Sequence, residues 1–135
     1  MSPRRQCPID YALEVFGDRW SLIVMRDILL AGKRHYRDLV TAKEGIATNV
    51  LASRLRKLEA TGLLERRADP DDKRTVFYVA TDKALDLIPV LLEISRWSVK
   101  HDPHSAAPPE LVKRFDADRE QLIADLQQAA RARQR

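Results

Sequence analysis

The chain has 135 residues, 44% of them hydrophobic and 33% charged, with a net charge of +4, a composition typical of one soluble domain with a modest core. Its apolar runs fall short of the roughly 20 residues of a membrane span, and the start MSPRRQCPID lacks the apolar region of a signal peptide. A single cysteine excludes an intramolecular disulfide framework, so we expect a cytoplasmic protein that does not bind membranes.

Periodicity and stop signals divide the chain into short helices and one pair of strands. The expected elements, in chain order, are helices over 8–16, 19–31, 35–42 and 48–61, strands over 63–68 and 75–80, and helices over 81–101 and 110–133. Glycines follow the first, second and fourth of these helices, and Asp18 is placed to cap the second. The second helix is apolar on nearly every side, so it should be buried.

The helix over 48–61 is cationic and amphipathic. Leu51, Leu55 and Leu58 form one inward stripe, whereas polar and basic residues occupy the opposite side. The two strands that follow are joined by the turn signal DPDDK at 69–73. A helix with a free polar face and a hairpin directly after it predict a winged helix-turn-helix. The expected fold class is therefore mainly α with a small β-hairpin.

The C-terminal half shows a proline inside a helix and a proline-rich segment. Pro89 is unfavourable within the helix over 81–101 and predicts either a kink or a late start. Residues 102–109 should be a linker between a winged domain over 1–101 and a C-terminal helix over 110–135. The sequence leaves open whether this last helix folds back or crosses to a partner.

Apolar residues remain after the core of a winged domain is filled. A lone domain of this size would struggle to bury them all, so they are expected to form a helical homodimer interface. The residues expected in this interface are Tyr11, Leu91, Ile94, Trp97, Phe115, Leu122 and Leu126.

The outward face of the helix over 48–61 offers the side chains with which proteins contact double-stranded DNA. The residues expected at base edges are Thr48, Asn49, Ala52, Ser53 and Arg56. The residues expected at phosphates are Arg54 and Lys57 on the flanks of the helix and Lys73 and Arg74 in the wing, where an aspartate should pair with an arginine. Ordinary solvated positions would look similar on the helix alone, and the hairpin beside it favours DNA.

Charge is distributed in a way that agrees with this interpretation. Residues 1–68 carry 13 Lys and Arg against 8 Asp and Glu, a net charge of +5, whereas residues 69–135 carry 11 against 12, a net charge of −1. The positive charge of residues 1–68 suits contacts with DNA phosphates, because Lys and Arg displace the counterions condensed on DNA. A generic solvated surface could carry the same charges.

Patterns that would indicate catalysis or a bound metal are missing from the sequence. The three histidines, His35, His101 and His104, accompany no HExxH or CxxC pattern, and neither a glycine-rich phosphate loop nor a GxSxG elbow occurs. We therefore expect no enzyme and no cofactor. Cys7 stands at the start of a helix near Arg4 and Arg5, so it is a candidate redox sensor. The alternative is a small residue that packs against a partner helix.

Several motifs occur in a fixed order between residues 7 and 101. They are Cys7-Pro8, Gly17-Asp18-Arg19-Trp20, Tyr36-Arg37-Asp38-Leu39, Gly45-Ile46, Gly62-Leu63-Leu64-Glu65-Arg66 and Trp97. As an ordered set they resemble the HxlR-type bacterial transcriptional regulators. This resemblance implies a homodimeric winged-helix repressor or activator that binds an inverted-repeat operator, with a dimer interface from the first and last helices. Some members of that family sense oxidants or electrophiles through the cysteine that matches Cys7.

The sequence departs from the family pattern at several places, among them Ala84, where the family has a glycine, and the wing Asp72-Lys73-Arg74, which looks more like the MarR family. Ala47 and Thr48 stand where the family has Ser and Pro, so Thr48 would supply the helix cap, and the last helix is longer than the family norm, as in the related MarR family. We expect a sequence-specific DNA-binding homodimer that acts as a repressor. The alternatives are a MarR-like regulator that responds to an oxidant or small-molecule effector, and a winged helix used for protein contacts. The polar, cationic face at 49, 53, 56 and 57 favours DNA.

Overall fold

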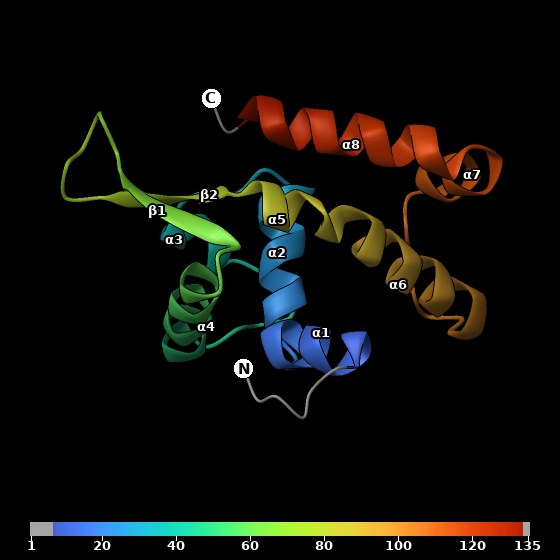
Figure 1. Ribbon diagram of the computed structural model, residues 1–135, viewed down its shortest axis with the longest axis horizontal. Coiled ribbons are helices and arrows are strands. Elements are labelled where there is room, and N and C mark those ends of the chain that lie inside the picture. Colours follow the sequence, from blue (N-terminus) through green and yellow to red (C-terminus); the bar gives the residue numbers. More distant parts are fainter. Residues whose placement is uncertain (1–6, 134–135) are drawn as a thin grey trace.

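The computed structural model describes residues 7–133 and follows the predicted order of elements (Figure 1). Its helices and strands are α1 (Pro8–Phe16), α2 (Ser21–Leu29), α3 (Tyr36–Leu39), α4 (Thr48–Ala60), β1 (Leu64–Ala68), β2 (Val76–Ala80), α5 (Asp82–Leu85), α6 (Leu87–His101), α7 (Pro109–Ala117) and α8 (Arg119–Arg133). α2 stands between α4 and α6, and the hairpin projects beyond α4 (Figure 1). The expected fold class, mainly α with a small hairpin, is confirmed.

The central helix α2 is buried, as its apolar sequence predicted. Met25 and Leu29 have no exposed surface. The helix begins at Ser21, two residues later than expected, and the Asp18 carboxylate accepts hydrogen bonds from the amides of Trp20 and Ser21, each at 3.0 Å. Asp18 therefore satisfies the free N–H groups at the start of α2, which is the role the sequence predicted for it.

The hairpin is fixed to the rest of the domain at its base. β1 and β2 pair in antiparallel register, with Leu64 opposite Ala80. The chain before α3 extends this sheet, because the Tyr78 amide donates to the Arg34 carbonyl oxygen at 2.9 Å. β2 is therefore hydrogen-bonded on both sides, by β1 and by the segment before α3. The hairpin tip at residues 69–75 projects from this three-segment base.

The long helix expected over 81–101 is two helices. α5 ends at Leu85 and α6 begins at Leu87, so Pro89 lies in the first turn of α6, where its missing N–H group costs no hydrogen bond. The late start, one of the two outcomes that Pro89 predicted, is confirmed. Thr81 caps α5, since its Oγ1 accepts the Ala84 amide at 3.3 Å.

The single helix expected over 110–133 is broken at Asp118. The backbone of Asp118 has φ −155° and ψ 81°, which is outside the helical region, and its Oδ1 accepts the Gln121 amide at 3.1 Å. α7 ends there and Asp118 caps α8. The prediction of one continuous helix was wrong, because an aspartate can begin a new helix where no glycine or proline marks a break.

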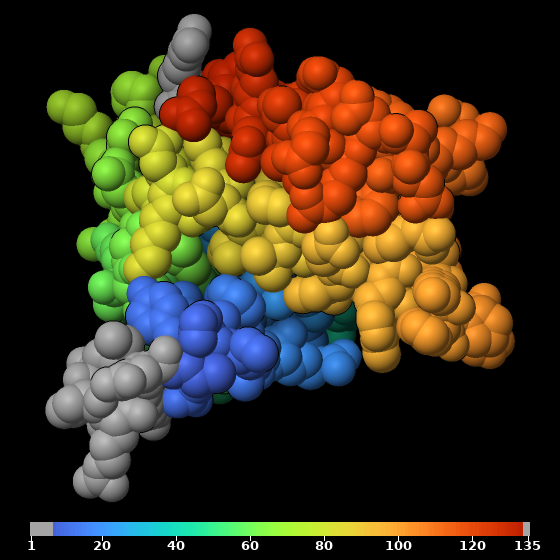
Figure 2. Space-filling model, turned by 45° about the vertical axis from the view of Figure 1, so that its right-hand side comes forward, coloured from blue at the N-terminus to red at the C-terminus, as the bar shows by residue number. Residues whose placement is uncertain are grey.

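The last helix, α8, folds back onto its own chain (red in Figure 2). Leu122 is 1% exposed and lies in the core. Gln127 Nε2 donates to the Leu85 carbonyl oxygen at 3.2 Å, and Arg133 Nη2 donates to the Leu29 carbonyl oxygen at 2.6 Å. α8 therefore packs on α5 and reaches the end of α2, which settles its path within the single chain.

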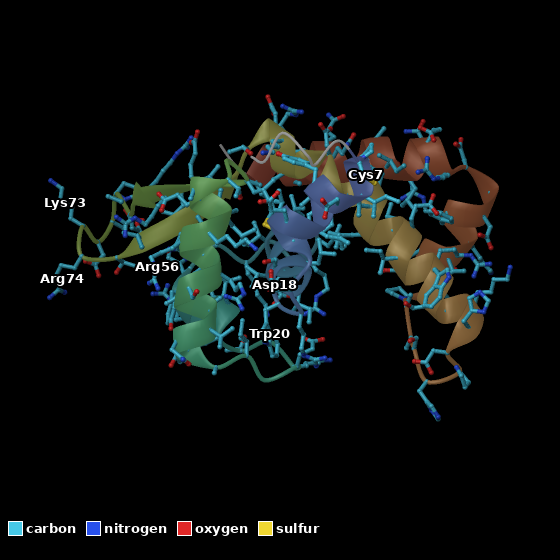
Figure 3. All side chains as sticks on the ribbon, turned by 60° about the horizontal axis from the view of Figure 1, so that its bottom comes forward. Cys7, Asp18, Trp20, Arg56, Lys73 and Arg74 are labelled. Atoms are coloured by element: carbon cyan, nitrogen blue, oxygen red, sulfur yellow. The ribbon has the colours of Figure 1, made fainter. Side chains whose placement is uncertain are left out.

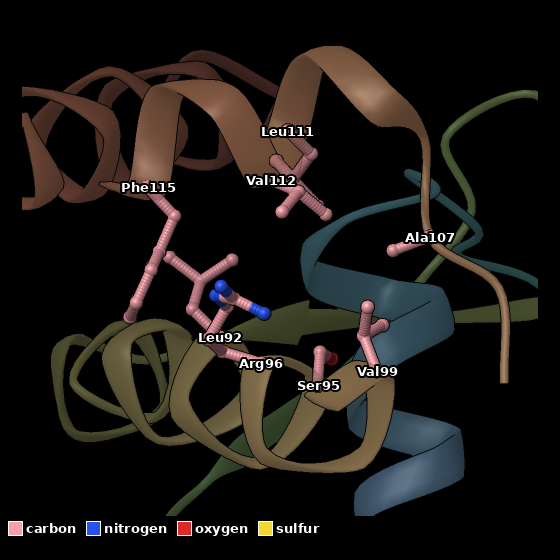
Figure 4. Close-up of a pocket in the computed structure, with 8 residues that line it drawn as sticks. All are labelled: Leu92, Ser95, Arg96, Val99, Ala107, Leu111, Val112 and Phe115. Carbon is pink, nitrogen blue, oxygen red and sulfur yellow. The ribbon is translucent and has the colours of Figure 1, made fainter. Parts of the chain in front are cut away.

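α7 packs on α6 through apolar side chains (Figure 4). The residues between the two helices are Leu92, Val99, Leu111, Val112 and Phe115. Arg96 pairs with Asp116 at 2.9 Å beside them. The cavity among these side chains has a volume of about 10 Å³, which is room for a single water molecule, so this contact is a packing interface rather than a ligand site.

Candidate nucleic-acid interface

α4 turns one face to the core and the opposite face to solvent. Leu51, Leu55 and Leu58 are fully buried, which confirms the predicted inward stripe. The residues predicted to reach base edges lie on the other side: Thr48, Asn49 and Arg56 are exposed, and Ala52 and Ser53 are half-buried. Short polar side chains and one long cationic side chain thus share the free face of this helix.

The first turn of α4 is placed by α3. Tyr36 Oη donates to the Thr48 carbonyl oxygen at 3.0 Å, so the short helix holds the start of the longer one. The N-cap residue is Ala47, whose methyl group has no hydrogen-bond acceptor, and Thr48 is the first helical residue. The expectation that Thr48 supplies the cap was therefore wrong.

The wing tip carries Lys73 and Arg74 on the same side of the molecule as Arg56 (Figure 3). Both residues are exposed, and the Arg74 side chain is 93% exposed. Asp72 shapes the tip, since it accepts the Arg74 amide at 3.1 Å and Thr75 Oγ1 at 3.0 Å and pairs with the Arg74 guanidinium at 3.5 Å. This confirms that an aspartate of the turn pairs with a wing arginine.

The base of the wing is fixed by a histidine to which the sequence analysis gave no role. His35 Nε2 lies 2.9 Å from Asp69 Oδ2, and Asp69 Oδ1 accepts the Asp71 amide at 2.9 Å. These hydrogen bonds, from the Asp71 amide first and from His35 second, hold the pKa of Asp69 below its usual value. His35 and Asp69 are 34 positions apart in sequence, so no local pattern indicated their contact.

Two residues predicted at phosphates, Arg54 and Lys57, face an acidic partner within the chain. Arg54 Nε donates to Asp18 Oδ2 at 2.8 Å, and Lys57 Nζ lies 3.7 Å from Asp18 Oδ1. Burial would raise the pKa of Asp18, but hydrogen bonds from Ser21, Trp20 and Arg54 outweigh it and lower the pKa to about 2. Because the pKa is depressed, the ion pair is intact at neutral pH and is lost only as the pH falls toward that value.

A second ion pair joins α2 to the turn before α4. The two terminal nitrogens of Arg26 donate to the Glu44 carboxylate at 2.8 and 2.9 Å, and the same guanidinium contacts Asp27 Oδ1. The hydrogen bond from Arg26 lowers the pKa of Glu44 to about 2, against a smaller opposing effect of burial. Two ion pairs therefore fix this region: Asp18, just before α2, pairs with Arg54 of α4, and Arg26 of α2 pairs with Glu44 in the turn before α4.

The apolar residues predicted in a dimer interface fall into two groups. Leu91 and Leu122 are buried in the core of the single chain, and Phe115 and Leu126 are half-buried against it. Leu91 is 7% exposed and Leu122 1% exposed in the single chain, so both side chains are already largely covered by their own chain. The other three residues, Tyr11, Ile94 and Trp97, are exposed, and Trp97 is 67% exposed.

α1, a helix expected to join the dimer interface, carries two further exposed apolar side chains that the prediction did not name. Ile9 and Leu13 are four positions apart and so lie on the same side of the helix, a spacing that could have indicated them. α1 and the second half of α6 reach the surface on the same face of the molecule (Figure 2). The exposed apolar side chains of α1 and α6 are Ile9, Tyr11, Leu13, Ile94 and Trp97, and Tyr11 lies on the other side of α1 from Ile9 and Leu13.

Cys7 is exposed at the N-cap position of α1, away from the wing (Figure 3). Arg4 and Arg5, which the sequence analysis placed near it, lie outside the described residues. Within residues 7–133, no group of histidine, cysteine and acidic residues could hold a metal ion. None of the helices in that part of the chain has the length and apolar content that crossing a membrane requires.

A helix-turn-helix with an exposed polar face on α4 and a hairpin beside it that presents Lys73 and Arg74 defines the winged helix-turn-helix class of DNA-binding proteins. Residues 15–106 match the model of the HxlR-like helix-turn-helix family. The chain belongs to this family, whose members are DNA-binding transcriptional regulators and not enzymes. α7 and α8 lie beyond the matched residues.

Known proteins share this architecture. A helix-turn-helix transcriptional regulator of Halalkalibacterium halodurans is 32% identical over 94 residues, which cover 70% of this chain and 83% of the relative. The crystal structure of PA1607, a candidate transcription factor, superposes with a TM-score of 0.68 at 30% identity over 78% of this chain and 70% of the other. The quinone-bound regulator YodB of Bacillus subtilis superposes with a TM-score of 0.58 at 25% identity, over 70% and 99% of the two chains.

Proposed function

We propose that the protein is a repressor that binds an inverted-repeat operator as a homodimer. The observation that carries this proposal is the pairing of one exposed recognition helix per chain with the exposed apolar surface of α1 and α6. A palindromic site needs two recognition helices about one DNA turn, roughly 34 Å, apart. A two-fold partner on the apolar surface would supply the second helix.

The roles of the contact residues follow from their chemistry and position. Thr48, Asn49, Ser53 and Arg56 stand on the free face of α4, and we assign them to base edges, Asn49 to adenine and Arg56 to guanine. Lys73 and Arg74 stand at the wing tip, where an exposed cation contacts phosphates or enters the minor groove. We assign Lys57 to a phosphate beside α4.

Selection of bound DNA from a random pool by the purified protein tests this proposal. We expect an enriched inverted repeat, and a reporter gene placed behind that sequence should be expressed less when the protein is present. Enrichment of a single half-site, or of no sequence, would count against a homodimer on a palindrome. Higher reporter expression would instead make the protein an activator.

Replacing Arg56 or Asn49 by Ala should weaken operator binding by about 1–3 kcal/mol and relax specificity at one base position, because a bidentate base contact is lost. Replacing Lys73 by Ala should weaken operator and random DNA alike and flatten the salt dependence of binding. Lys113 is an exposed cation on α7, and Lys113→Ala is the control. It should change neither the affinity for DNA nor the salt dependence of binding. Equal weakening of both DNAs by all three wing and α4 variants would show that base and phosphate roles are not divided in this way.

A second candidate function is a response to oxidants or electrophiles through Cys7. Two observations favour it: the thiol is exposed, and the similar regulator YodB has been seen with a bound quinone. A cysteine thiolate is the nucleophile that reacts with such compounds. The remaining alternative, a winged helix for protein contacts, is disfavoured by the polar and cationic face of α4.

Cys7→Ser should leave DNA binding by the reduced protein unchanged, because Cys7 lies away from α4 and the wing. If Cys7 is the sensor, a quinone should release the wild-type protein from DNA and spare the variant. The measurement is DNA binding by both proteins before and after quinone treatment. Equal release of the two proteins would assign the response to another residue and reject this second function.

A further inference from the structure

Asp18 joins the start of α2 to the middle of α4. Its carboxylate accepts the Trp20 and Ser21 amides on one side and the Arg54 guanidinium on the other. The Asp18 side chain is 21% exposed and the Arg54 side chain 29% exposed, so their ion pair is partly shielded from solvent. A shielded pair at hydrogen-bond distance is less weakened by salt than an exposed one.

The two cations on this flank of α4 are held differently. The Arg54 guanidinium makes its second contact through Nη1 with Ser53 Oγ at 3.3 Å, so Nε and Nη1 both donate to groups of the protein. Lys57 Nζ lies 3.7 Å from Asp18, beyond a direct hydrogen bond, and its side chain is more exposed. Arg54 is therefore committed to Asp18, whereas Lys57 can still turn to a phosphate.

We infer that Asp18 determines specificity by withholding Arg54 from the DNA backbone and using it to fix α4 against α2. Each phosphate that a protein neutralises adds affinity for any sequence, whereas base contacts require a fixed orientation of the recognition helix. By pairing with Arg54, Asp18 removes a cation that would otherwise bind a DNA phosphate, and this lowers the affinity for all DNA. The same pair orients α4, and this raises the discrimination between sequences. Asp18 is thus a positioning residue that does not itself touch DNA.

This inference rests on DNA binding through α4, and it is independent of the dimer and of the inverted repeat. The first test uses the full-length protein and a short random-sequence duplex, with affinity measured over a series of KCl concentrations. Arg54→Gln should leave the slope of log affinity against log salt unchanged. Lys57→Gln, on the same flank of the same helix, should reduce the slope by about one per chain. A reduction of about one with Arg54→Gln would overturn the inference, because Arg54 would then neutralise a phosphate.

Asp18→Asn tests the same point in the opposite direction, since it removes the charge and keeps the shape. It should steepen the salt slope by about one per chain, raise affinity for the random duplex and lower the ratio of operator to random affinity. In the double variant with Arg54→Gln, the salt slope and the affinity for the random duplex should return to those of the wild type. An unchanged slope in Asp18→Asn would contradict the inference.

Glu59→Gln serves as the matched control, because it removes one negative charge from an exposed position on α4. It should leave the slope near that of the wild type. A slope as steep as that of Asp18→Asn would attribute the effect to net charge and overturn the role of Arg54. If Asp18→Asn does not fold, the comparison of Arg54→Gln with Lys57→Gln still decides the question.

Discussion

Replacing Trp97 by Glu should convert the protein to a monomer and lower its affinity for an inverted-repeat operator by about 10²–10⁴-fold. Trp97 is 67% exposed in the second half of α6 and contacts only the His101 ring among the described aromatic residues, so the change leaves the core intact. In the proposed dimer the new carboxylate would be buried against apolar side chains, which is unfavourable without a partner charge. Each recognition helix would then bind its half-site alone.

Sedimentation at micromolar concentration, paired with operator binding, measures this prediction. Gln128→Glu adds the same single negative charge at an exposed position of α8, outside α1 and α6, and should leave both the dimer and the affinity in place. Trp97→Phe should also remain dimeric, because it keeps an apolar ring. A Trp97→Glu protein that stays dimeric and keeps its affinity would locate the interface elsewhere.

Local sequence patterns were sufficient to predict most of the fold and the exposed face of α4. The spacing of Leu51, Leu55 and Leu58 predicted both the inward and the outward face of α4, because a helix period fixes one when the other is known. The aspartate-rich turn predicted the wing, and Pro89 predicted the late start of α6. Each of these features depends on residues that are neighbours in sequence.

Contacts between distant segments could not be predicted in this way. Arg54 and Asp18 are 36 positions apart, so the flank of α4 resembled a free phosphate-binding surface until its partner was placed beside it. The exposure of Trp97 and the burial of Leu122 are also tertiary properties, since both residues sit on the apolar sides of their helices. Hydrophobic periodicity shows that a residue is covered, but it does not show whether its own chain or a partner covers it.

Replacing Leu122 by Ala should lower the free energy of unfolding by about 2–5 kcal/mol, because a buried leucine leaves a cavity when it is truncated. Leu122 is 1% exposed and packs in the core beneath α8. The sequence predicted a helix over 110–135 that is joined to the winged domain only by a linker. With α8 folded back, deletion after Ala117 should destabilise the domain by more than Leu122→Ala does, since Ile123 and Ala130 are lost from the core as well.

Urea denaturation of the variant and of Leu126→Ala measures this effect, and the half-buried Leu126 should give the smaller loss. The decisive comparison introduces Leu122→Ala into the Trp97→Glu monomer. If α8 covers its own chain, the loss of stability persists in the monomer, because the cavity forms within one chain. If α8 instead crosses to a partner, Leu122 is already uncovered in the monomer and its truncation costs little. The same pair of substitutions therefore separates the core of the chain from the interface between chains.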